Sequence, residues 1–302
     1  MSGESQRGIR SAQTGILVNA SLAGVKLVAG LVGNSYALVA DAVESTADIL
    51  SSTIVWGGLR VASRDPDAEY PVGYGKAEPL AAAVVSLMLL GASVGIAFEA
   101  IREIRTPHHT PAPWTLAVLV GVVVVKGVLS RRVHAIGAEI GSTAVQADAW
   151  HHLSDALTSA AAFVGISIAV VGGPGWESAD DWAALAAAGV IAVNGVRTLR
   201  PALAEIMDRM PGPDVTGPVR RAAEAVAGVL ATEKLTVTKA GMAYRVTIHV
   251  QADPSMPLDA AHVLSGKVKS AIRAALPQVQ SVLVHMEPYE PARAQGTNEL
   301  QA

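Results

Sequence analysis

Long runs of apolar residues, separated by short polar connections, fill the first two thirds of the chain. Residues 79–98 and 156–176 contain no charged side chain, and a helix needs about 20 apolar residues to cross the hydrocarbon core of a bilayer. Connections that contain glycine or proline interrupt the runs. The pattern predicts six membrane-spanning helices, at residues 14–32, 36–61, 79–101, 113–130, 147–171 and 182–200.

The pattern changes after Pro211-Gly212-Pro213. Apolar residues there follow helical or alternating periods, which predict a helix, two strands, a second helix and a last strand. This αββαβ order fits a two-layer, ferredoxin- or metallochaperone-like α/β domain. The predicted elements are residues 219–229, 235–239, 244–250, 258–276 and 279–286.

The expected fold is therefore a mainly α membrane protein with a small α/β domain at its C-terminal end. We expect a short N-terminal cytosolic segment over residues 1–13 and a transmembrane domain over 14–210. A cytosolic regulatory and dimerisation domain follows over 211–290, and residues 291–302 are expected to be a disordered tail.

Composition and charge support this division. The chain is 51% hydrophobic and 16% charged, whereas a typical soluble domain is about 25% charged. It has no cysteine, which excludes disulfides and thiolate metal sites. The net charge of −3 gives no indication of a nucleic-acid partner.

The basic residues of the connections predict the orientation. Lysine and arginine gather on the cytosolic side of membrane proteins, so we expect both termini in the cytosol of a multi-pass, bacterial-type plasma-membrane protein. On that side lie Arg7, Arg10, Arg60, Arg64, Lys76, Arg131, Arg132, Arg197, Arg200 and Arg209, and on the other lie Arg102 and Arg105.

One polar pattern, A-D-A-x-[E/H]-x-x-x-D, occurs twice, at residues 40–48 of the second predicted span and 147–155 of the fifth. Positions i, i+3 and i+7 of a helix share one face. Each span therefore presents a stripe of three polar groups. These groups are Asp41, Glu44 and Asp48 in one span and Asp148, His151 and Asp155 in the other.

Such groups are costly inside a bilayer unless they are paired, hydrated or bound to an ion. Facing carboxylates cannot neutralise one another, but a shared cation can. Glu44 with Asp48, and His151 with Asp155, would supply three oxygen ligands and one nitrogen ligand, a set suited to Zn²⁺, Fe²⁺, Mn²⁺ or Co²⁺. The alternative is a set of structural polar contacts, or a water-filled cavity that binds no metal.

These two segments resemble the cation diffusion facilitator family, and the resemblance extends over almost the whole chain. It implies a homodimer in the lipid bilayer that exports divalent cations from the cytosol, usually in exchange for protons. It also implies that Glu44, Asp48, His151 and Asp155 bind the transported ion, with Asp41 and Asp148 beside them or along the pathway. Zn²⁺ is the first expectation, although Glu44 stands where many zinc-transporting relatives have Asp or His.

The resemblance has consequences outside the spans. Tyr70 and Tyr74 stand where relatives with a metal site in the second connection carry histidines, so we expect no metal site there. Lys76 matches a lysine that pairs with an aspartate after the last span, here Asp208. The alternative for Lys76 is an ordinary cytosolic-side charge.

In the predicted soluble domain, His249, His262 and His285 match positions where relatives bind regulatory metal between subunits. Glu287 lies two residues after His285, which places both on one face of a strand. Glu233 stands where relatives have another histidine. A regulatory Zn²⁺ is the one cofactor expected beyond the transported ion, and the alternative is that these histidines are structural or solvated.

Three further polar residues fall within spans. Asn19 predicts a hydrogen bond between helices. Lys26 and Lys126 predict side chains that either extend to the membrane surface or pair with a carboxylate, for which Asp41 and Asp148 are the candidates. An intramembrane metalloenzyme is disfavoured, because the chain has no H-E-x-x-H motif and no separate general base. A metal sensor that transports nothing stays open as an alternative.

Overall fold

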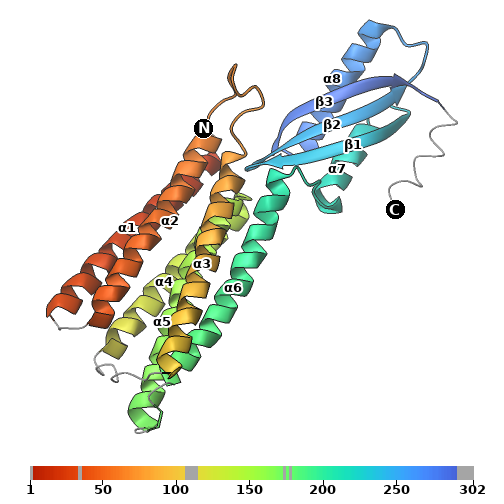
Figure 1. The fold of residues 1–302 in the computed structure, drawn as a ribbon. Coiled ribbons are helices and arrows are strands. Elements are labelled where there is room, and N and C mark those ends of the chain that lie inside the picture. The colour runs from red at the N-terminus through yellow and green to blue at the C-terminus, as the bar shows by residue number, and fades with distance from the viewer. Residues whose placement is uncertain (1–2, 33–35, 106–114, 173–174, 177–178, 291–302) are drawn as a thin grey trace. The chain divides into compact units, whose positions relative to one another are not determined.

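The computed structural model describes residues 3–32, 36–105, 115–172, 175–176 and 179–290. They form two compact units, Met1–Ala204 and Glu205–Ala302 (Figure 1). The tail predicted at residues 291–302 lies outside the described part of the chain.

Within the described residues, the first unit consists of long helices that coincide with the predicted spans. α1 begins at Gly3, well before its predicted start, because the polar residues that precede the apolar run are also helical. α4 likewise continues past residue 130 through Arg131 and Arg132. The helices are α1 (Gly3–Val32), α2 (Tyr36–Ala62), α3 (Ala77–Arg105), α4 (Thr115–Glu139), α5 (Thr143–Gly172) and α6 (Ala179–Ile206).

These helices pack mainly in neighbouring pairs, α1 with α2 and α4 with α5, and α3 contacts both α2 and α5. Gly58 shows how closely α2 and α3 approach. A Cβ atom at this position would lie 2.5 Å from the Ala81 Cβ and 3.1 Å from the Ala77 carbonyl oxygen. Only glycine permits that separation, and small residues at helix contacts are typical of packing in membranes.

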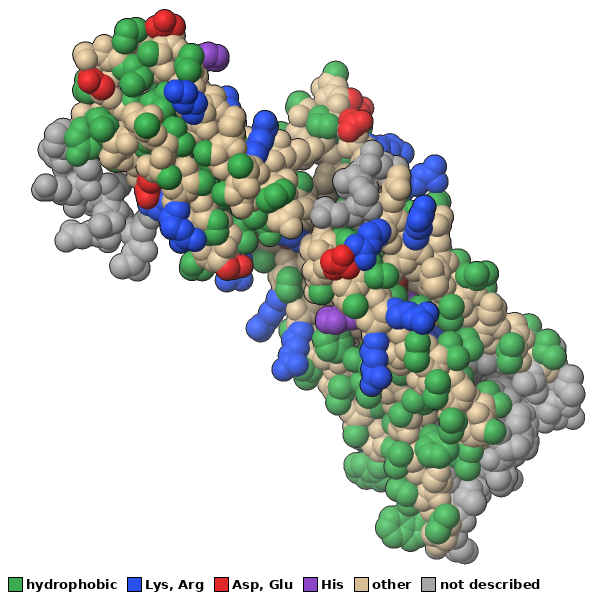
Figure 2. All heavy atoms as spheres, turned by 180° about the vertical axis from the view of Figure 1, so that it is seen from behind, with side chains coloured by type: hydrophobic (Ala, Val, Ile, Leu, Met, Phe, Trp, Pro, Cys, Tyr) green, Lys and Arg blue, Asp and Glu red, His purple; other side chains and the backbone are tan. Residues whose placement is uncertain are grey.

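The helical unit exposes large apolar side chains and buries several charged ones. Its exposed side chains include Leu17, Val94 and Phe98, of which Phe98 is 71% exposed. Figure 2 shows hydrophobic side chains spread along its surface. Lys126 and Asp148, by contrast, are fully buried. Exposed large apolar side chains together with buried charges suit a lipid environment.

Two of the described helices, α3 and α6, are long and apolar enough to cross a membrane by length and composition. The count of six spans stays a prediction.

The second unit has the predicted αββαβ order. It contains α7 (Pro213–Glu224), β1 (Ala231–Ala240), β2 (Ala243–Ala252), α8 (Leu258–Ala275) and β3 (Val279–Pro288). The sheet order is β1-β2-β3, with β1 antiparallel and β3 parallel to β2. The parallel pair is joined through α8, as a parallel connection requires. The predicted fold class is confirmed.

Alternation along the strands builds the core of this unit. Val246, Ile248 and Val250 of β2 point to one face, where they pack with Val268 and Ile272 of α8. The intervening residues of β2, including His249, therefore lie on the opposite face of the sheet.

The predicted bounds of the helix α7 were wrong. The apolar period predicted residues 219–229, but the helix begins at Pro213 and ends at Glu224. Pro213 follows the cap residue Gly212, where the fixed φ of proline suits a helix start. The helix ends before Gly228, which adopts a positive φ of 100°.

Candidate metal centres

Helices α2 and α5 bring three metal-binding side chains together inside the helical unit. Ligand atoms of Asp48, His151 and Asp155 all lie within 4.8 Å of one another. His151 Nε2 is 3.1 Å from Asp48 Oδ1, so the two helices are linked directly. We call these three residues the helix cluster. Two carboxylates and one imidazole form a donor set that divalent transition metals accept.

Lys126 of α4 contacts the helix cluster. Its Nζ donates a hydrogen bond of 2.7 Å to Asp48 Oδ2 and another of 2.7 Å to Asp155 Oδ2. The lysine side chain is 1% exposed. Lys126 was expected to extend to the membrane surface or to pair with a carboxylate. It pairs with Asp48 and Asp155, which are not the expected candidates Asp41 and Asp148. Residue periodicity within α2 and α5 contains no information about which side chain of α4 approaches them.

A second buried polar layer adjoins the helix cluster. Ser52 donates a 3.1 Å hydrogen bond to Asp148 Oδ1, and His152 Nε2 lies 3.6 Å from Asp148 Oδ2. Gly15 of α1 closes this layer, since a Cβ atom there would lie 3.0 Å from Ser52 Oγ and 3.2 Å from His152 Nε2. Asp148 therefore lies beside the cluster with its own partners. His152, next to the predicted ligand His151, had not been singled out from the sequence.

Several predicted residues cannot be placed in the cluster from the structure. Glu44 and Asp41 lie on α2, and Lys26 lies on α1. Their side chains fall outside the described ones, so their expected roles stay predictions. Asn19 of α1 is fully buried, but neither of its amide atoms makes a hydrogen bond to a described residue. The interhelical hydrogen bond expected for Asn19 is therefore not observed.

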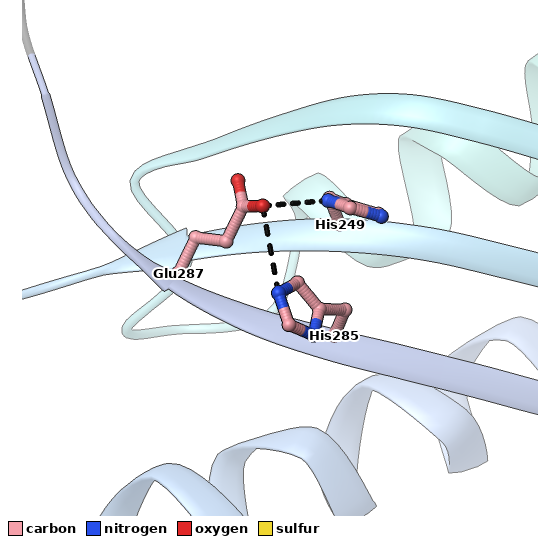
Figure 3. Close-up of side chains that lie close together, drawn as sticks. All are labelled: His249, His285 and Glu287. Carbon is pink, nitrogen blue, oxygen red and sulfur yellow. Dashed lines mark hydrogen bonds and ion pairs between the residues drawn. The ribbon is translucent and has the colours of Figure 1, made fainter.

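A second group of metal-binding side chains lies on the sheet of the other unit. His249 on β2 and His285 and Glu287 on β3 have ligand atoms within 4.8 Å of one another (Figure 3). Glu287 Oε1 is 2.7 Å from His249 Nδ1 and 3.6 Å from His285 Nε2. We call these three residues the sheet cluster. Its nitrogen and oxygen donors fit a divalent transition metal such as Zn²⁺.

Strand register explains the sheet cluster. His249 is paired with His285 across the parallel strands, and with Glu233 across the antiparallel strands. His262, predicted with this group, does not join it within one chain. It lies on α8, and α8 packs on the opposite face of the sheet from His249.

The surroundings of Glu287 favour its charged form. Burial by itself would raise its pKa, but hydrogen bonds with His249 and Glu233 and the positive charge of Lys234 outweigh burial and lower the pKa. The ionised carboxylate is thus retained near neutral pH, as a metal ligand requires.

The two tyrosines of the second connection contact each other. The ring centroids of Tyr70 and Tyr74 are 4.5 Å apart, and the Tyr74 hydroxyl donates a 2.5 Å hydrogen bond to Asp67 Oδ2. This hydrogen bond lowers the pKa of Asp67. Lys76 precedes α3 and Asp208 follows α6. Because they belong to different units, their pairing stays a prediction.

Comparison with known proteins identifies relatives of both units. Residues 12–207 match the cation efflux transmembrane domain, and residues 211–289 match the cytoplasmic domain of cation efflux proteins. Among solved structures, a nickel form of a MamM CTD variant is 24% identical. It covers 26% of this chain and 100% of its own, with a TM-score of 0.26.

Two curated relatives cover most of this chain. It is 28% identical over 299 residues to metal tolerance protein C1 of Arabidopsis thaliana, a match that covers 94% of this chain and 63% of that relative. It is 27% identical over 278 residues to the manganese efflux system protein MneP of Bacillus subtilis, a match that covers 91% of this chain and 94% of MneP. The chain thus spans less than two thirds of the Arabidopsis protein but almost all of MneP.

Proposed function

Because the chain belongs to the cation efflux family, also known as the cation diffusion facilitators, we propose that it exports divalent transition-metal ions from the cytosol across a membrane. The observation that carries this proposal is the helix cluster. Asp48, His151 and Asp155 meet within 4.8 Å on two helices, inside a unit whose exterior is apolar. Buried ionisable groups that face one another within such a unit mark an ion pathway.

Glu44 is the proposed fourth ligand. It precedes Asp48 by four residues on α2, and residues at this spacing lie on the same face of a helix. Three oxygen ligands and one imidazole would accept Zn²⁺, Mn²⁺, Fe²⁺ or Co²⁺. Zn²⁺ is the first cation to test, and the similarity to a manganese efflux protein makes Mn²⁺ the second.

Export in exchange for protons follows from the same ligands. Imidazole and carboxylate groups must be deprotonated to bind a metal, so metal binding releases protons. Protons on the outer side would then compete with the bound ion when the helices re-pack to face outward, an alternation between two conformations with different affinities.

The chain is also proposed to act as a homodimer in a bacterial-type plasma membrane, with both termini in the cytosol. Residues 211–289 match a cytoplasmic domain, and the sheet cluster would hold a regulatory divalent ion there. An ion that binds only the folded domain stabilises it by mass action. The domain boundaries near residues 13, 210 and 290 belong to this proposal.

A transport assay tests the proposal. The purified chain is reconstituted in liposomes with a pH gradient, and uptake of Zn²⁺, Mn²⁺, Fe²⁺ and Co²⁺ is followed with a metal-sensitive dye inside the vesicles. We expect uptake that depends on the proton gradient and stops when an ionophore collapses it. Equal uptake by protein-free liposomes would overturn the proposal.

A further inference from the structure

Lys126 is bound to the same two carboxylates to which the proposed function assigns the transported ion. Its ammonium group is hydrogen bonded to Asp48 and Asp155, at 2.7 Å from each. These are the two carboxylates of the helix cluster. The lysine is almost completely buried, and Asp48 and Asp155 are 6% and 18% exposed.

The ammonium group and a metal ion would compete for the same space. Metals of this class bind carboxylate oxygen at about 2.0–2.2 Å. An ion bound to both Asp48 Oδ2 and Asp155 Oδ2 would have to lie between these atoms, where the Lys126 Nζ is found. The two cations would also repel each other strongly at such a distance, because the cluster is buried and the interior screens charges less than bulk solvent does.

The chemistry of lysine allows the exchange. Its ammonium group is carried on a flexible four-carbon stem, so Nζ can leave the carboxylates through side-chain rotation while α4 stays in place. As long as no metal is bound, the lysine supplies a positive charge beside both carboxylates, which would be costly in the interior of the helical unit without a cationic partner.

We propose that Lys126 is a tethered cation that occupies the transport site in its metal-free form and is displaced by the incoming divalent ion. This inference rests on the proposed function of the helix cluster. Lys126 lowers the affinity for metal by the cost of its displacement, and its return helps the bound ion to leave.

The test measures metal affinity by isothermal titration with Zn²⁺ or Mn²⁺ on the full-length chain. His249→Ala and His285→Ala are introduced together, so that the sheet cluster no longer contributes to the measured metal binding. In this background Lys126→Met, which keeps most of the length of the side chain and removes its charge, should bind metal at least tenfold more tightly, equivalent to about 1.4 kcal/mol. Lys126→Arg keeps the charge and should bind within about threefold of the parent chain, which is less than 1 kcal/mol.

Controls separate this effect from structural loss. Lys239→Met removes another paired lysine, which lies 2.9 Å from Glu205 in the second unit, and should leave the affinity unchanged. If Lys126→Met does not fold, Lys126→Gln provides a smaller uncharged side chain that can still donate hydrogen bonds. Unchanged or weaker metal binding in the uncharged variant that folds would overturn the role of Lys126. It would not affect the proposal that the helix cluster binds the transported ion. No metal binding by the parent chain would overturn the proposed function as well.

Discussion

The two clusters of metal-binding side chains use the same kinds of ligand atom in opposite surroundings. The helix cluster lies inside a helical unit, and its side chains are 6% to 18% exposed. The sheet cluster lies on an open sheet face, and its His285 side chain is 59% exposed. Both bring their ligand atoms within 4.8 Å.

The charges of the two clusters are also balanced differently, because one cluster is buried and the other is exposed to water. Asp48 and Asp155 share a buried lysine, because charges in a low-dielectric interior need a direct partner. In the sheet cluster Lys234 stays 3.9 Å from Glu287 and is itself 59% exposed, so water supplies much of the stabilisation there. Under the proposal for Lys126, an ion that enters the helix cluster would have to replace this lysine.

Removal of one ligand tests the role of the helix cluster most directly. Asp48→Ala or Asp155→Ala should abolish transport. Loss of a direct ligand should exceed the roughly 10- to 100-fold loss of metal affinity seen for residues that only orient a ligand. Metal uptake in liposomes and titration of purified protein measure the effect. Asp259→Ala, at an exposed carboxylate in the first turn of α8, is the control, and wild-type flux in either cluster variant would refute the assignment.

The corresponding experiment on the other unit removes the two histidines of the sheet cluster. His249→Ala with His285→Ala should lower the number of metal ions bound per chain by one and leave transport active. Metal at 100 times its Kd adds about 2.7 kcal/mol to the stability of a folded unit, and the double variant should lose this increment in thermal unfolding. Complete loss of transport in this variant would show that the two clusters are not independent.

A smaller effect concerns Glu287 without metal. Its pKa is lower in the folded protein than the ordinary value of 4.5, so its stabilising contribution is present above that value and is lost as pH falls through the folded pKa. Glu287→Gln should cost about 1 kcal/mol at pH 7, and the difference from wild type should shrink on acidification below pH 4.5. Chemical unfolding in EDTA at several pH values measures it. A difference that is independent of pH would assign the loss to packing.

Tyr74, in the second connection, should contribute least to metal affinity. Tyr74→Phe removes the hydrogen bond to Asp67, and the pKa of Asp67 should rise toward its ordinary value. Surface substitutions of this kind change the free energy of unfolding by about 0.5 kcal/mol or less. Because Tyr74 belongs to neither cluster, metal affinity should stay within about twofold. Titration of the full chain measures the affinity, and a large loss would show that this connection takes part in metal binding.

Local pattern was sufficient for most of the fold and for part of the candidate site. The apolar runs coincide with α1 to α6, and the alternation of β2 separates core residues from His249. The repeated motif identified Asp48, His151 and Asp155, since three positions on one helix face follow from 3.6 residues per turn. These features depend on neighbours along the chain, so local pattern is enough to predict them.

Contacts between distant segments required the tertiary structure. Lys126 was expected either to extend to the membrane surface or to pair with a carboxylate, because its partners depend on how α4 packs against α2 and α5. His262 was grouped with His249 by resemblance, yet the fold places α8 on the other face of the sheet from His249. The sequence thus determined which residues carry charge and metal-binding atoms. Only the packing of helices and strands decided which of them meet, because periodicity within an element contains no information about the neighbour that element will have.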